Sequence, residues 1–148
     1  MSDIKKVSDF LADAGVFFLA SIDGDQAKCR PLGFQMLEDD KIYFGVGSFK
    51  EVWKQIEENP KIEIVALNEA KDKFLRYYGT AKADPNPELV EKTFELMPEI
   101  GAIYKENGWE MAMFYLDDAT AEFRNMMAIE EKYEFKYYAH ALIFIYYC

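Results

Sequence analysis

The chain has 148 residues, enough for one ordinary domain with a hydrophobic core and too few for two such domains. Apolar residues make up 51% of it, which excludes intrinsic disorder as its default state. The 17 lysines and arginines against 27 aspartates and glutamates give a formal net charge of −10. This excess of negative charge disfavours nucleic acid or a membrane surface as a partner.

The same composition limits targeting and metal chemistry. The first ten residues show no apolar run followed by small residues, so we expect no secretory signal and a cytoplasmic protein. The longest apolar stretch, of about a dozen residues, is shorter than a membrane-spanning helix. Cys29 and Cys148 are expected to be free thiols. His140 is the sole histidine, so neither a Ser-His-Asp triad nor a metal site is expected.

The first part of the chain predicts a helix followed by a hairpin. Residues 2–15 carry apolar side chains at helical spacing and end at a glycine, which is typical of a helix stop. Asp23-Gly24 then joins two strand-like runs, 16–22 and 27–37. We therefore expect these two runs to pair antiparallel.

The rest of the chain alternates helices with strand-like runs. Ser48 and Glu51 have the spacing of a capping box, which predicts a helix over 48–58. A second helical region, 85–108, is expected to bend or break near Pro98 and Gly101. The remaining strand-like runs are 42–47, 62–69, 74–84 and 109–127, the last divided in two at Asp117-Asp118.

This order of elements predicts one mainly β (α+β) domain over residues 1–148. Most of the strands are joined by tight turns, which favours antiparallel pairing. About six short antiparallel strands usually close into a barrel, with helices flanking it. The sequence has no Gly-x-Gly-x-x-Gly fingerprint, so a doubly wound dinucleotide fold is not expected.

Residues 29–33, Cys-Arg-Pro-Leu-Gly, form the first candidate for binding a ligand. Pro31 indicates an edge strand or a bulge, because proline cannot donate to a sheet ladder. Gly33 permits close approach, so a flat ligand could lie against this backbone, with Arg30 beside it. The alternative interpretation is an irregular barrel edge that carries a surface arginine.

Residues 45–51, Gly-Val-Gly-Ser-Phe-Lys-Glu, form the second candidate. Free N–H groups and the positive end of a helix dipole favour a phosphate at such a helix start, and Lys50 adds a full positive charge. An ordinary capped helix with a solvated lysine is the alternative. Because one tight turn joins the two candidates, we expect them to be neighbours in the sheet, around a ligand with one phosphate and one planar ring system.

The sequence resembles the pyridoxamine-phosphate-oxidase-like FMN-binding split-barrel family. The resemblance covers about residues 3–127 and depends most on the Arg-Pro-hydrophobic-Gly strand and the stretch from Ser48 to Asn59-Pro60. It implies a six-stranded antiparallel Greek-key split barrel that forms a homodimer, with FMN in the groove between the two subunits.

The resemblance also implies which residues contact FMN. The strand expected to pass the flavin ring and ribityl chain contains Arg30, Pro31, Leu32 and Gly33, and the phosphate is expected at Val46, Gly47, Ser48 and Lys50. Val46 stands where a threonine is common in the family, and Phe49 where a second basic residue often stands. Contacts from the partner subunit are expected from strands near residues 109–115.

The end of the chain departs from the family pattern. Residues 128–148 form an atypical tail without the Arg-Leu-Ala-Pro motif of true pyridoxamine phosphate oxidases, so oxidation of pyridoxamine phosphate is not expected. Elsewhere, Trp53 is expected to pack in the core or at an interface, and Cys29 to be buried and inert.

The leading hypothesis is an FMN-dependent oxidoreductase that passes hydride or electrons from a nicotinamide or other donor to a small acceptor. The sequence offers no general acid or base to name as a catalytic residue. Two alternatives are a flavin carrier or redox sensor without turnover, and a dimeric ligand-binding module without a cofactor. Relatives that bind haem also exist, but a lone histidine in the tail disfavours haem.

Overall fold

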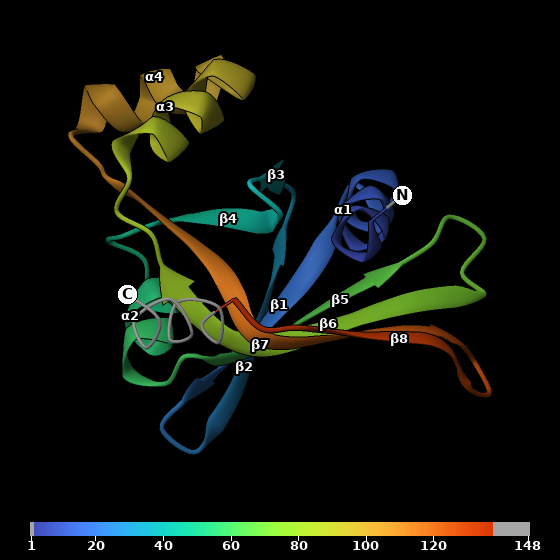
Figure 1. The fold of residues 1–148 in the computed structure, drawn as a ribbon. Helices are drawn as coiled ribbons and strands as arrows, with labels where there is room; N and C mark the ends of the chain where they lie inside the picture. The colour runs from blue at the N-terminus through green and yellow to red at the C-terminus, as the bar shows by residue number, and fades with distance from the viewer. Residues whose placement is uncertain (1, 138–148) are drawn as a thin grey trace, which may run out of the picture.

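A computed structural model describes residues 2–137 of the chain (Figure 1). Its elements are α1 (Asp3–Ala14), β1 (Phe17–Asp23), β2 (Gln26–Leu32), β3 (Met36–Glu38), β4 (Lys41–Gly47), α2 (Glu51–Glu58), β5 (Lys61–Leu67), β6 (Lys73–Ala83), α3 (Pro87–Leu96), α4 (Pro98–Asn107), β7 (Met111–Asn125) and β8 (Ile129–Phe135). His140 and Cys148 lie outside the described residues.

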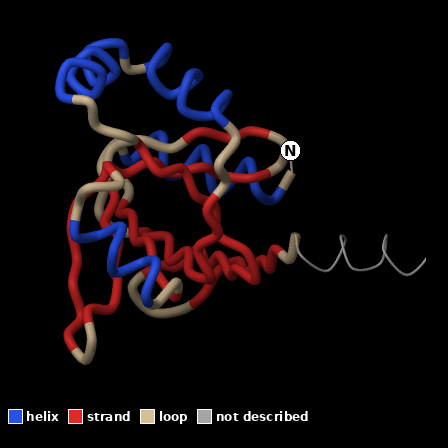
Figure 2. The backbone as a smooth tube through the Cα atoms, turned by 90° about the vertical axis from the view of Figure 1, so that its left-hand side faces the viewer, coloured by secondary structure: helices blue, strands red, loops and turns tan. Residues whose placement is uncertain are grey.

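The strands of the described chain form one antiparallel sheet in the order β2-β1-β5-β6-β7-β4-β3, with β8 added beside β7. The sheet does not close on itself, as expected for a split barrel. Its strands curve around a common interior (Figure 2), into which α1 and α2 pack apolar side chains such as Leu11 and Ile56. α3 and α4 pack on each other and stand out at one end (Figure 1).

The interior is the main hydrophobic core. Its largest fully buried side chains come from strands far apart in the sequence and include Phe17, Phe44, Tyr77 and Phe114. The Phe44 ring lies 5.8 Å from Phe17 and 5.7 Å from Phe114, so aromatic contacts join β1, β4 and β7. A smaller cluster outside this core joins β4 and β7 to α3, through residues such as Tyr43, Met113 and Leu89.

Several predictions from the sequence are confirmed. The hairpin of β1 and β2 turns at Gly24, whose φ of 63° is the left-handed conformation that favours glycine. β2 is an edge strand, as Pro31 indicated. The helical region 85–108 breaks at Met97, directly before Pro98.

Other predictions need correction. α2 begins at Glu51 with Lys50 as its N-cap and has no side-chain cap, so Ser48 does not form the expected capping box. Residues 111–125 are one strand, in which Asp118 has a positive φ of 46° where the pairing with β6 shifts register. The described chain also has eight strands, because 26–38 divides into β2 and β3 and because β8 occupies part of the predicted tail.

The two candidate segments are not neighbours in the sheet. β2 ends one side of the sheet order, whereas β4 lies near the other side and pairs with β3 and β7. The prediction failed because β3 and β4 do not continue next to β2. α2 is the element that both segments share, since Lys50 caps it and Arg30 bonds to Gln55 in its second half.

Candidate functional site

Arg30 points into the barrel, on the same face of the hairpin as the fully buried Leu19 opposite it. Its guanidinium donates to the Leu19 carbonyl at 3.2 Å, to Ser21 Oγ at 2.7 Å and to Gln55 Oε1 at 2.8 Å. Ser21 also donates to Gln55 Oε1 at 2.6 Å. Partial burial lowers the pKa of Arg30. Arg30 therefore joins the β1–β2 hairpin to α2 in this conformation.

The junction of β4 and α2 contains the predicted phosphate residues. Ser48 donates its N–H to the Glu110 carbonyl at 2.9 Å and its hydroxyl to the same oxygen at 3.1 Å. The Lys50 N–H donates to the Gly47 carbonyl at 3.0 Å. The Lys50 side chain is exposed. Among the groups expected to bind phosphate at this junction, the Lys50 ammonium is the positively charged one, and it is exposed to solvent.

Gly47 and the exposed Phe49 form an aromatic junction with the loop before β7. A Cβ on Gly47 would lie 2.6 Å from the Phe49 ring and 2.9 Å from Tyr104 Oη, so the glycine makes room for these two side chains. The Phe49 ring lies 4.5 Å from the Trp109 ring. The residue that replaces a cation of the family pattern is therefore held in an aromatic stack.

The other predicted site residues lie on different faces. Val46 is 5% exposed and belongs to the main core, and Leu32 packs against that core. Pro31 is exposed and pairs with Phe18 on the outer face of the sheet. Gly33 is exposed, and a Cβ there would make only an ordinary contact at 3.7 Å. Their roles toward FMN stay predictions.

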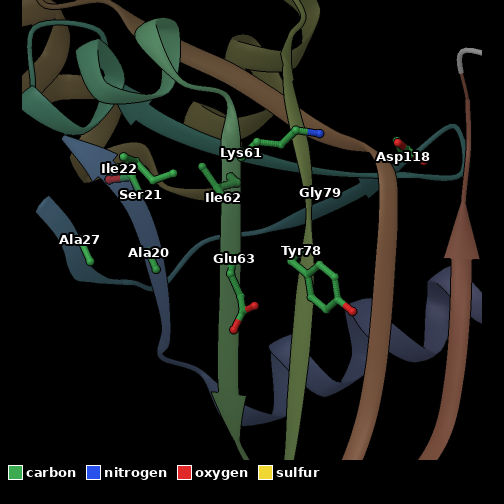
Figure 3. A pocket seen from close by; sticks show the side chains of 10 residues that line it. All are labelled: Ala20, Ser21, Ile22, Ala27, Lys61, Ile62, Glu63, Tyr78, Gly79 and Asp118. Carbon is green, nitrogen blue, oxygen red and sulfur yellow. The ribbon is translucent and has the colours of Figure 1, made fainter. Parts of the chain in front are cut away.

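A hollow of about 390 Å³ lies on the outer face of the sheet (Figure 3). It crosses β1, β5 and β6, and its lining includes Ser21, Ile22, Lys61, Glu63, Tyr78 and Gly79. Ser21 connects this hollow to Arg30 through the hydrogen bond at 2.7 Å. Sequence reasoning missed the hollow, because its walls come from strands that are distant in the sequence.

Charged residues border the hollow on the β6 side. Arg76 forms a two-point ion pair with Glu63, at 2.8 and 3.0 Å. Tyr78 donates to Glu122, which also pairs with Arg124. The hydrogen bond from Tyr78 is the main cause that lowers the pKa of Glu122. These side chains hydrogen-bond to one another, and the bonds fix the positions of Glu63 and Tyr78 in the lining of the hollow.

The β1–β2 side of the same face is apolar. Phe18 of β1 is 48% exposed, and Ile22 of β1 and Leu67 of the neighbouring β5 are also exposed. Cys29 is exposed beside them, so the expectation of a buried cysteine was wrong. The reason is alternation: Cys29 pairs with Ala20, whose side chain faces outward, whereas Arg30 points inward.

Comparison with known protein families agrees with this fold. The sequence profile of the pyridoxamine 5'-phosphate oxidase family matches residues 4–126. The chain belongs to this family. Comparison with curated protein sequences gives no significant match.

Solved structures support the fold. A NimC/NimA family protein from Clostridium acetobutylicum is 28% identical, with a TM-score of 0.80, over 90% of this chain and 94% of that one. A pyridoxamine 5'-phosphate oxidase-related, FMN binding protein from Nostoc punctiforme is 15% identical (TM-score 0.64, 90% of each chain). A heme binding protein from Mycobacterium smegmatis is 9% identical (TM-score 0.67, 90% of this chain and 58% of that one).

Two kinds of feature are absent from the described residues. Within residues 2–137, His, Cys, Asp and Glu side chains form no cluster of three or more that could hold a metal ion. No helix in the same range is long and apolar enough to cross a membrane.

Proposed function

We propose that the chain binds FMN as a homodimer and acts as an oxidoreductase that passes hydride or electrons to a small acceptor. The observation that carries this proposal is the hollow of about 390 Å³ next to an exposed apolar strip on the sheet, in a chain of this family. Its volume lies in the usual range for small-molecule sites. The FMN binding of the Nostoc punctiforme protein of the same fold supports the choice of cofactor.

The residues present include groups that suit two parts of a flavin, its planar ring system and its phosphate. The exposed apolar side chains around the hollow suit a planar ring system. Lys50 does not line the hollow, and it is the exposed cation of the predicted phosphate segment. Arg30 does not line the hollow, so it would influence a bound flavin indirectly, through its hydrogen bond to Ser21, which does line the hollow. When bound, FMN supplies the electron-transfer chemistry, and the chain supplies position and electrostatics.

The homodimer is proposed from the exposed apolar strip. Phe18, Ile22 and Leu67 are exposed on one face of the sheet, and Pro31 and Cys29 extend that surface along β2. Apolar surface of this kind marks an interaction site in a protein that stays in solution. A second copy would bury the strip and complete the hollow from its other side.

Cofactor binding is tested by titrating the purified protein with FMN and following the flavin absorbance and fluorescence. We expect Lys50→Ala to weaken FMN binding roughly 10- to 150-fold, because a cation–phosphate contact is worth about 1.5–3 kcal/mol. Lys54→Ala, on the same helix and also exposed, is the matched control. Equal affinity of the Lys50 variant and wild type would place the phosphate elsewhere.

The dimer is tested separately by sedimentation of a Phe18→Asp variant. Phe18 lies on the apolar strip but outside the lining of the hollow, so we expect a monomer with weakened FMN binding. Leu96→Asp, at an exposed position of α3, is the control that should leave the dimer intact.

Turnover is the third measurement, with NADH or NADPH as donor and an added acceptor. Bound flavin without turnover from either donor would favour the carrier or sensor. A protein that takes up no FMN at all would favour a ligand-binding module without a cofactor.

A further inference from the structure

A second concave site lies where β6 leaves the sheet and α3 begins. It has a volume of about 210 Å³, is partly open, and is separate from the hollow on the outer face. Its main walls are Trp53 of α2, Asp84 of the β6–α3 connection, Val90 of α3, and Met111, Ala112 and Met113 of β7. We call it the β6–α3 pocket.

The methionine wall of the β6–α3 pocket depends on Gly45. Gly45 pairs with Met113 across the β4–β7 ladder, and a Cβ on it would lie 2.7 Å from Met111 Sδ and 3.0 Å from Met113 Sδ. The missing side chain lets both thioethers lie over β4. Trp53 adds an indole to another part of the lining, because it packs against the main core, whereas Met111 and Met113 belong to the smaller cluster outside that core.

Asp84 gives the pocket its polarity. Its carboxylate accepts from Tyr43 Oη at 2.8 Å and from the Asn86 N–H at 3.1 Å. Burial, together with this hydrogen bond to Asp84, raises the pKa of Tyr43, so the tyrosine remains a donor. Both interactions are with neutral groups, and none of the ion pairs among residues 2–137 involves Asp84.

The pocket therefore joins an aromatic and thioether surface to a partly buried negative charge that lacks a cationic partner in the described chain. Each carboxylate oxygen has two lone pairs, so both can accept a further hydrogen bond. A cation held next to an indole and a carboxylate gains from both, whereas an anion is repelled by Asp84.

The volume sets the size of the ligand. An apolar cavity of about 150 Å³ holds one benzene ring, so about 210 Å³ suits one ring with a short substituent. We propose that the β6–α3 pocket binds a single aromatic ring that carries a protonated amine, with the ring against Trp53 and the methionines and the amine at Asp84. The inference requires neither FMN nor the dimer.

The test compares three probes of similar size on the purified full chain: benzylamine, toluene and benzoate. Binding is followed by calorimetry, and by tryptophan fluorescence in a Trp109→Phe background that leaves Trp53 as the reporter. We expect benzylamine to bind most tightly, toluene more weakly and benzoate most weakly. Benzoate binding as tightly as benzylamine, or no binding of any probe, would overturn the proposal.

Variants separate charge from shape. Asp84→Asn keeps the size of the side chain and an acceptor oxygen, and should weaken benzylamine about tenfold while leaving toluene unchanged. Ala112→Leu fills the pocket and should abolish binding of both, whereas Ala112→Ser should not. Asp13→Asn, at an exposed position of α1 that lines neither the hollow nor this pocket, is the charge control. Unchanged benzylamine affinity in a folded Asp84→Asn protein would refute the role of the carboxylate.

Discussion

Gly79 gives the sharpest test of how the hollow is built, because no side chain fits there. An ideal Cβ on Gly79 would lie 2.8 Å from Ala119 Cα and 2.9 Å from the Asp117 carbonyl oxygen. Both atoms belong to the backbone of β7, at the point where the β6–β7 register shifts. Gly79→Ala therefore forces two central strands apart, rather than moving the end of a side chain.

The expected cost follows from this contact. Overpacking a well-packed site typically costs about 1–3 kcal/mol, and a clash with backbone on two sides belongs at the upper end of that range. For a domain of this size, about 3 kcal/mol lowers the melting temperature by about 6–12 °C. Urea unfolding followed by circular dichroism, with a thermal melt, measures both quantities.

Gly45→Ala is the matched control for Gly79→Ala. A Cβ at Gly45 approaches Met111 Sδ at 2.7 Å and Met113 Sδ at 3.0 Å, which are atoms of flexible side chains. We expect this variant to lose less than about 1 kcal/mol, since methionine adapts its shape readily. If Gly79→Ala is as stable as Gly45→Ala, the close approach of β6 and β7 does not determine stability.

Three smaller predictions concern single hydrogen-bonding groups. Ser21→Ala removes an acceptor of Arg30 and should lower the free energy of unfolding by about 1–3 kcal/mol in urea titrations, whereas Ser21→Thr should not; equal stabilities would contradict the network. Asn86→Ala removes the N-cap of α3 and should cost about 1 kcal/mol, which Asn86→Asp should avoid. The hydrogen bond from Tyr78 lowers the folded-state pKa of Glu122, so its stabilisation is complete above the ordinary glutamate value of about 4.3 and is lost as pH falls through the lower folded-state value. Glu122→Gln should therefore destabilise the protein at pH 7 and do so less at pH 3; an equal effect at both pH values would refute this linkage.

The sequence was most informative where local chemistry determines structure. The glycine at the turn of the first hairpin, Pro31 on an edge strand and Pro98 at the helix break all act on their own backbone, so their effects are visible without the fold. The sheet order is not local. A tight turn between segments predicted that β2 and β4 are neighbours, but the chain turns from β2 through β3 to the other side of the sheet.

The candidate site was predicted less completely, for the same reason. The glycines at 45 and 47 suggested exposed backbone for a phosphate, whereas each makes room for side chains of distant elements, Met111 over β4 and Tyr104 next to Phe49. A residue's own neighbours in the sequence cannot show that a methionine more than sixty positions away requires the space. Lys50 differs because its exposure at a helix start depends on α2 alone.

A residue of a family motif can be needed for the fold or for recognition of the cofactor. Arg30 lies in a segment that carries the resemblance and Gly79 within the range that the resemblance covers, yet each has a structural role in this fold. Arg30 joins a hairpin to α2, and Gly79 lets two strands approach. Such residues identify the fold whether or not a flavin is bound. In the proposed function, the cofactor is instead recognised by groups that remain exposed, namely Lys50 and the apolar strip with Phe18. Substitutions at Lys50 and Phe18 therefore test function with little effect on folding, whereas substitutions at Arg30 and Gly79 test the fold first.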